Sequence, residues 1–119
     1  MVLVDTSVWV AHLREGAIGL DALLNEGHVF CHPFVMGELA CAKLKNRTEI
    51  LSLLQALPAA VPAEHDEVMN FIETHGLMGK GLGYIDAHLL VSASLTQAPL
   101  WTLDKKLLDA SSRLGLAYG

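Results

Sequence analysis

Short apolar runs alternate with longer amphipathic segments along the chain. The apolar runs predict buried strands at 2–4 (VLV), 28–31 (HVFC) and 100–102 (LWT), and two further short strands at 59–62 and 116–118. Helical periodicity predicts helices at 7–13, 19–26, 33–45, 46–57, 64–75, 84–95 and 105–114. Because strands alternate with helices, the pattern predicts βαβ units and a parallel sheet that helices cover on both faces.

Glycine and proline mark the ends of several of these elements. Pro33 suits the first turn of a helix, and Pro58 follows the end of the helix predicted at 46–57. The segment 76–83 contains four glycines and is predicted to be a loop that leads into the helix at 84–95.

Composition limits the range of possible proteins. A length of 119 residues favours a single domain that spans residues 1–119. The chain has 52% hydrophobic and 18% charged residues, which allows a sizeable core. A net charge of −5 argues against nonspecific attachment to nucleic acid, which needs a basic face. The charge still allows an enzyme that handles nucleic acid through a local basic patch and a metal ion.

The chain shows no pattern typical of secretion or membrane insertion. Asp5 interrupts the N-terminus before any long apolar segment, so no secretory signal is predicted. The apolar segment 84–95 contains Asp86 and is too short to span a bilayer. Cys31 and Cys41 form neither a metal-type spacing nor a disulfide framework, and we interpret both as small buried side chains in a reducing cytoplasm.

Four carboxylates occur among apolar residues, at strand ends or helix starts. In a parallel sheet, ligands bind beyond the carboxyl ends of the strands, so the residues that follow each strand are candidates for a site. The four are Asp5 after VLV, Glu38 within PFVMGELACAKL, Asp86 within GYIDAHLLVSASL, and Asp104 within LWTLDKKL.

Each of these acids taken singly has a simpler explanation, as a helix cap or a surface residue. Together they predict a metal site. Desolvating a carboxylate costs several kcal/mol, whereas a helix N-terminus returns only about 0.3–1 kcal/mol. Four converging acids also repel one another, and a divalent cation would offset both costs. Oxygen ligands favour Mg²⁺ or Mn²⁺. His88 follows Asp86 at a spacing that points to another side of the helix, so we interpret it as structural.

On these residues the chain resembles the PIN-domain ribonucleases, specifically the VapC-type toxins of bacterial toxin–antitoxin pairs. The resemblance runs nearly end to end and rests on LVDTSVWVAHL, CHPFVMGEL, GYIDAHLLVSA and LWTLDKKL in that order. It implies a three-layer α/β/α fold with a central parallel sheet of about five strands, and Mg²⁺- or Mn²⁺-dependent endonucleolytic cleavage of RNA. Such relatives cut particular tRNAs or ribosomal RNA and stop translation. A small antitoxin, whose tail enters the acidic site, inhibits them, and they are often homodimers.

We assign roles to the single acids as a hypothesis. Asp5 and Asp86 would bind the metal directly, Asp104 directly or through water, and Glu38 would orient the attacking water or a metal-bound water; one metal ion or two could operate.

Hydroxyl groups and one lysine complete the implied site. Thr6, or alternatively Ser7, matches the hydroxyl that supports the first acid, and Thr102 matches a hydroxyl two residues before the last acid. Lys106 stands where many relatives place a further acid or Asn, which would weaken a second metal.

Candidate surfaces for RNA and protein partners follow from the remaining residues. Lys80, Lys105, Lys106 and the basic cluster KLKNR could contact phosphate, and the alternative is that they are solubilising charges. Trp9 and Phe34 are predicted as exposed apolar positions that could serve a homodimer or an antitoxin groove.

Three rival interpretations remain open. A phospho-receiver domain would suit the length, but it needs paired acids after the first strand and a lysine after the last. A D-x-D-x-T phosphatase would need an acid where Ser7 stands. A catalytically inactive PIN fold that only binds a partner is the third, and metal-dependent cleavage would discriminate it from the enzyme.

Overall fold

Three parallel strands form the centre of the molecule. The computed structural model describes residues 1–16 and 18–119. In it, β1 (Val2–Val4) lies between β2 (Val29–Phe30) and β3 (Leu100–Trp101). Leu3 of β1 is the partner of Phe30 on one side and of Leu100 on the other. Because all three strands are parallel, their carboxyl ends meet at one edge, directly before Asp5.

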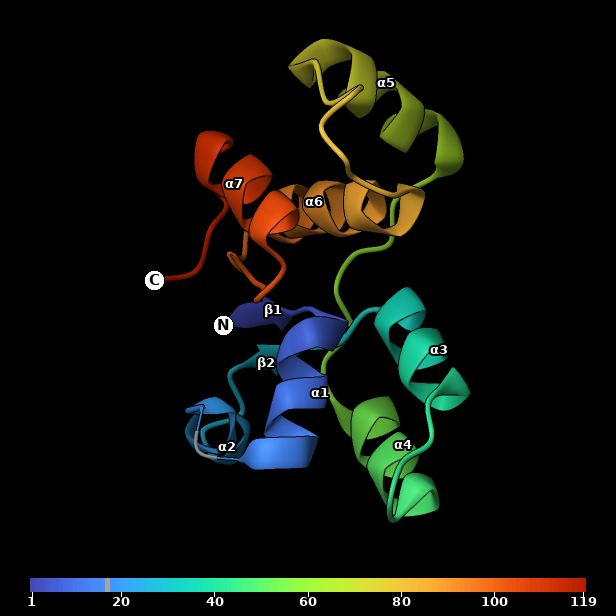
Figure 1. Cartoon of the computed structure of the whole chain (residues 1–119), viewed down its shortest axis with the longest axis vertical. Coiled ribbons are helices and arrows are strands. Elements are labelled where there is room, and N and C mark those ends of the chain that lie inside the picture. The colour runs from blue at the N-terminus through green and yellow to red at the C-terminus, as the bar shows by residue number, and fades with distance from the viewer. Residues whose placement is uncertain (17) are drawn as a thin grey trace.

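Helices cover both faces of this sheet, which confirms the predicted α/β fold with three layers. Figure 1 shows α6 and α7 on one side of the strands and α1 to α4 on the other, with α5 packed against α6. The bounds are α1 (Thr6–Glu15), α2 (Leu20–Asn25), α3 (Pro33–Cys41), α4 (Arg47–Ala56), α5 (His65–His75), α6 (Tyr84–Thr96) and α7 (Lys105–Arg113).

The core forms where the central strand meets the helices on its two faces. All three residues of β1 are buried, as expected for a parallel strand with helices on both sides. The middle of α6 contributes Leu89 and Leu90, and α1 contributes Val8 and Trp9. The prediction that Trp9 is exposed is wrong, since only 1% of its surface is accessible. The side of α1 that carries Trp9 packs into the core.

The prediction of about five strands is wrong for the described residues, which contain three. The two outer segments form isolated bridges instead, at Ala59 beside Cys31 and at Ala117 beside Leu100. Pro58 and Pro62 flank the first of these segments and cannot donate backbone hydrogen bonds, so its pairing stops after one residue.

α3 ends four residues earlier than the sequence predicts. It stops at Cys41, and Ala42 has an extended backbone. The Arg47 guanidinium donates to the carbonyl oxygen of Ala40 (Nη2 to O, 2.9 Å), in place of a helical N–H. The same early end leaves Cys41 exposed, so its predicted burial is wrong, whereas Cys31 is buried as predicted.

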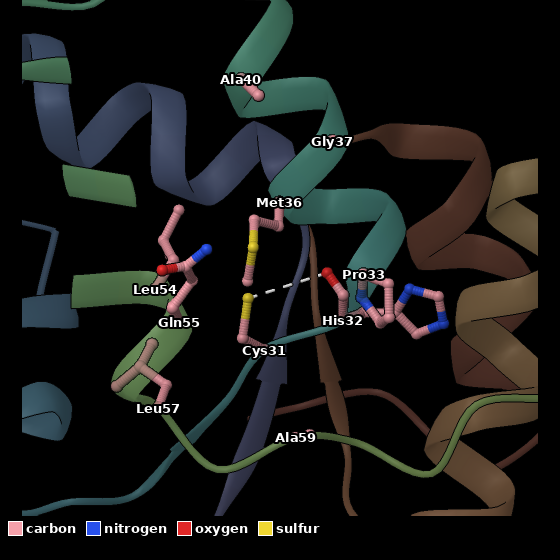
Figure 2. A pocket seen from close by; sticks show the side chains of 10 residues that line it. All are labelled: Cys31, His32, Pro33, Met36, Gly37, Ala40, Leu54, Gln55, Leu57 and Ala59. Atoms are coloured by element: carbon pink, nitrogen blue, oxygen red, sulfur yellow. Dashed lines mark hydrogen bonds between the residues drawn. The ribbon is translucent and has the colours of Figure 1, made fainter. Parts of the chain in front are cut away.

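An apolar groove of about 400 Å³ lies where α3 packs against α4. Figure 2 shows Met36 and Cys31 pointing toward one another in this groove, with Leu54 and Leu57 nearby and the His32 ring turned away from them. The His32 ring lies 6.4 Å from the His88 ring of α6, measured between centroids. In the described part of the chain, no helix is long and apolar enough to cross a membrane.

Candidate active site

Asp5 occupies the carboxyl end of the central strand and is nearly buried. Its backbone N–H still donates to Trp101 of β3 (N to O, 2.9 Å), and its extended backbone begins α1. Only 7% of the residue is exposed. Asp5 makes no side-chain cap to α1, which excludes the simple capping explanation for this acid.

Two hydroxyl groups stabilise the Asp5 carboxylate instead. Ser7 Oγ donates to Asp5 Oδ2 at 2.8 Å, and Thr102 Oγ1 donates to the same oxygen at 2.7 Å. These bonds compensate part of the desolvation cost of a buried charge. Thr102, the hydroxyl residue that the resemblance singled out, thus contacts Asp5 from β3's carboxyl end. Of the two hydroxyls considered for Asp5, the structure selects Ser7 and not Thr6.

The same hydroxyls fix the loop between β3 and α7. The backbone N–H of Leu103 donates to Ser7 Oγ (2.9 Å), and the N–H of Asp104 donates to Thr102 Oγ1 (3.0 Å). Asp104 Oδ1 then accepts from the N–H of Leu107 (2.9 Å), which caps α7. The position of Asp104 is therefore coupled to that of Asp5 through two hydroxyl groups.

Asp86 lies in the first turn of α6, and its surroundings connect it to both other aspartates. Its Oδ2 accepts from the N–H of Gly83 at 2.9 Å. Burial raises the pKa of the Asp86 carboxyl; the Gly83 hydrogen bond opposes this rise, and the negative charges of Asp5 and Asp104 add to it. The three carboxylates thus belong to one electrostatic environment at the carboxyl edge of the sheet.

Glu38 is exposed on α3 and is tied to the start of α1. Thr6 Oγ1 donates to Glu38 Oε1 at 2.7 Å. Thr6 therefore orients Glu38, and the expectation that it supports Asp5 is wrong. The reason is local geometry, because α1 starts at Thr6 and turns this side chain toward α3 while Ser7 turns back to Asp5.

The acidic residues offer the donor chemistry of a hard divalent cation. Among residues 1–16 and 18–119, no group of three or more His, Cys, Asp and Glu side chains lies close enough to hold one ion as the side chains stand. The hydrogen bonds between described residues use one oxygen of each aspartate: Oδ2 of Asp5, Oδ2 of Asp86 and Oδ1 of Asp104. Oxygen donors under mutual repulsion fit Mg²⁺ or Mn²⁺ better than a softer metal.

A cluster of aromatic and histidine rings packs beside Asp86. The buried His88 ring makes edge contacts with Phe34 (4.7 Å between centroids) and Tyr84 (4.5 Å). His32 Nδ1 accepts from the N–H of Phe34, and burial together with the charge of His88 lowers the pKa of His32 to about 4. Burial, and secondarily the charge of His65, lowers the pKa of His88. The packing agrees with the interpretation of His88 as a structural residue.

Known proteins share this sequence and this fold. Residues 2–112 match the PIN domain family. The chain is 44% identical over 118 residues to Ribonuclease VapC32 of Mycobacterium tuberculosis, in strain CDC 1551 / Oshkosh and in strain ATCC 25618 / H37Rv, covering 98% of this chain and 95% of the relative.

Two crystal structures resemble the fold at low sequence identity. PAE2754 from Pyrobaculum aerophilum has a TM-score of 0.64 and 20% identity, covering 92% of this chain and 78% of that chain. FitAcB from Neisseria gonorrhoeae has a TM-score of 0.61 and 19% identity, covering 94% of each chain.

The fold and the acidic edge of the sheet thus define a class, and the sequence matches give the family. The chain belongs to the PIN domain family, and within it to the VapC-type ribonucleases. With the family shown, the phospho-receiver and phosphatase alternatives no longer stand.

Proposed function

We propose that this chain is the toxin of a toxin–antitoxin pair, a Mg²⁺- or Mn²⁺-dependent endoribonuclease that cuts structured RNA, a tRNA or ribosomal RNA, and so inhibits translation. The observation that carries the proposal is the placement of three aspartates: Asp5 follows β1, Asp104 follows β3 at the same edge of the sheet, and Asp86 lies in the first turn of α6. Burial, and secondarily the charges of Asp5 and Asp104, raises the pKa of Asp86. The name of the M. tuberculosis relative, a ribonuclease, supports the same reaction class.

The proposed role of each carboxylate follows from its hydrogen-bond partners. Asp5, Asp86 and Asp104 would hold the cation, whose chemistry is to lower the pKa of a bound water and to neutralise charge on the phosphodiester. Ser7 and Thr102 keep Asp5 in one rotamer, so that its charge does not have to reorganise during the reaction. Glu38, exposed and oriented by Thr6, would accept a proton from the attacking water.

The proposal includes two protein partners and a compartment. A cognate antitoxin would neutralise the toxin by covering the acidic site, and a second copy would form a homodimer. Phe34 is an exposed aromatic residue that suits such a contact, whereas the buried Trp9 does not. We place the protein in the cytoplasm, where its RNA substrates are.

The proposed reaction is tested by cleavage of total structured RNA with purified protein. The assay compares Mg²⁺, Mn²⁺ and EDTA, and new 5′ ends are mapped. We expect discrete cuts that require the metal and that disappear in Asp5→Asn, because this substitution removes a buried ligand. Circular dichroism and metal binding by calorimetry show whether the variant is folded and what it has lost.

Two outcomes would contradict the proposal. Cleavage at the wild-type rate by Asp5→Asn would show that the acidic edge is not the catalytic centre. A wild-type protein that is folded, free of antitoxin and unable to bind metal or cut any RNA would instead be the inactive PIN module that only binds a partner.

A further inference from the structure

A cleft of about 800 Å³ opens between α7 and the glycine-rich loop that precedes α6. Figure 1 places α7 and this loop on the same side of the sheet as α6. Four cations line the cleft: Lys80 from the loop, and Lys105, Lys106 and Arg113 from α7. None of the four candidate catalytic acids lines it, so the cleft is a separate surface from the acidic edge.

The charge of the cleft contrasts with that of the whole chain. The protein has a net charge of −5 and eight Lys and Arg residues, of which half line this one cleft. Asp109 is the one acid in the lining, and it pairs with Arg113 (Nε to Oδ2, 3.5 Å). Within the described residues, no ion pair engages Lys80, Lys105 or Lys106. The three lysine charges are therefore available to an external anion.

Gly81 leaves room for the Lys106 side chain to lie against the loop. A Cβ atom at Gly81 would lie 2.6 Å from Lys106 Cδ and 2.7 Å from Lys106 Nζ, which is closer than real Cβ contacts. The Lys106 side chain therefore lies across Gly81, next in sequence to Lys80. Two lysines from distant segments of the chain therefore line one cleft, and their like charges favour an anion there.

The cleft leads away from the candidate catalytic acids. Asp104 caps α7, and Lys105 and Lys106 follow it in the first turn. Arg113 lies in the last turn, about 12 Å further along the helix axis at 1.5 Å per residue. A chain of phosphates that passed the acidic edge could continue along α7 and meet positive charge over this length.

We propose that this cleft binds the phosphodiester backbone of the RNA strand that flanks the scissile bond, with Lys80 and Lys106 as its phosphate contacts. The inference rests on the proposed ribonuclease function. It gives a role to Lys106, whose ammonium group lies against the glycine-rich loop and has no ion-pair partner among the described residues. Ammonium groups neutralise phosphates and release their counterions, which makes the binding sensitive to salt.

Binding measured without cleavage tests the cleft by itself. Fluorescence anisotropy follows a labelled single-stranded oligoribonucleotide with wild-type protein and Lys80→Ala/Lys106→Ala, in EDTA and over a salt series. We expect the double variant to bind about tenfold more weakly at low salt. The slope of log K against log salt should fall by about 1.4, since each single-strand phosphate contact contributes roughly 0.7.

A matched variant controls for the loss of two charges. Arg14→Glu lowers the net charge by two, as the cleft variant does, at an exposed residue near the end of α1 that does not line the cleft. We expect it to bind RNA with the wild-type affinity and salt slope. An equal loss in both variants would overturn the proposal, because the effect would then come from net charge.

The remaining outcomes separate this proposal from the proposed function. If wild-type protein cuts RNA and Lys80→Ala/Lys106→Ala binds RNA unchanged, the ribonuclease stands and the cleft proposal is wrong. If wild-type protein cuts nothing but the cleft variant loses RNA binding in EDTA, the cleft proposal stands without the reaction. If the variant loses binding of a poly-glutamate peptide and keeps RNA binding, the cleft receives an acidic protein segment and the proposal is overturned.

Discussion

The acidic edge and the basic cleft are built in opposite ways. At the acidic edge, Asp5 is nearly buried, and two hydroxyls hold one of its oxygens at 2.7 and 2.8 Å. In the cleft, Lys80 and Lys106 are exposed and have no ion-pair partner among the described residues. Fixed carboxylates suit a reaction that needs a constant geometry, whereas long exposed side chains suit an anion whose path can vary.

The largest expected effect concerns Asp86→Asn, which separates chemistry from binding. We expect RNA cleavage to fall by about a hundredfold to a thousandfold, the range seen when one electrostatic stabiliser is removed. RNA binding in EDTA should be unchanged or tighter, because the variant loses a negative charge and keeps the cleft. Cleavage rates and anisotropy on the same preparation measure the two effects.

The same variant should also change how stability depends on pH. A carboxyl whose pKa is raised in the folded state binds its proton more tightly there than in the unfolded state. Its stabilising contribution is present at low pH and is lost as the pH rises through the raised pKa. Metal-free Asp86→Asn lacks this loss, so at pH 7 it should be at least as stable as the wild type in urea. A marked destabilisation would contradict a raised pKa of the Asp86 carboxyl.

A smaller effect is expected from Thr102→Val, which removes one donor from the buried carboxylate without changing the side-chain shape. We expect a loss of about 2 kcal/mol in the free energy of unfolding, since hydrogen bonds to charged groups contribute roughly 1.5–3 kcal/mol. Cleavage should fall roughly tenfold to a hundredfold, because Asp5 is no longer held in one rotamer. Urea denaturation and the cleavage assay measure the two quantities.

Thr6→Val is the matched control, because Thr6 donates at the same distance of 2.7 Å to the exposed Glu38. Water can replace this donor, so we expect a change in stability within about 0.5 kcal/mol. If both substitutions lowered the free energy of unfolding equally, the burial of Asp5 would not be what makes the Thr102 hydrogen bond important for stability.

The contrast between the two regions also explains what the sequence could predict. Asp5 and Asp86 were recognisable as site candidates because a carboxylate inside an apolar run conflicts with its surroundings. The conflict cannot show which donor resolves it: Thr6 and Ser7 are both hydroxyl residues next to Asp5, and only the start of α1 decides which one turns back. The roles of the single acids stay predictions.

The fold was predictable where an apolar run stands between clear boundary signals. The strand at 2–4 and the long helix after the glycine-rich loop lie where the pattern placed them. The two outer strands were predicted, but the structure has only single bridges at Ala59 and Ala117. Pairing there depends on partners elsewhere in the sheet, which the local sequence does not show. The prediction that Trp9 is exposed was wrong for a similar reason, because the local sequence does not show which face of a short helix meets the core.

The sequence named Lys80, Lys105 and Lys106 as candidate phosphate contacts but could not show that they line one cleft. Lys80 and Lys106 are 26 positions apart, and nothing in an exposed lysine distinguishes a phosphate contact from a solubilising charge. Only the passage of the Lys106 side chain across Gly81 brings the two segments together.

The smallest expected effect, and the most specific one for the cleft, comes from Gly81→Ala compared with Gly79→Ala. Both glycines lie in the loop before α6 with positive φ, +77° and +74°, so an alanine at either position strains the backbone by about 1 kcal/mol. A Cβ at Gly81 displaces the Lys106 side chain, whereas a Cβ at Gly79 meets nothing within 4 Å. We expect similar stability for the two variants in urea.

RNA binding should distinguish them. Gly81→Ala should weaken binding in EDTA by less than the Lys80→Ala/Lys106→Ala variant does, since the Lys106 charge is moved and not removed. Gly79→Ala should bind as the wild type does. If both alanines weakened binding equally, the loop conformation would control the interaction. The contact between Lys106 and Gly81 would then be a consequence of packing with no part in holding RNA.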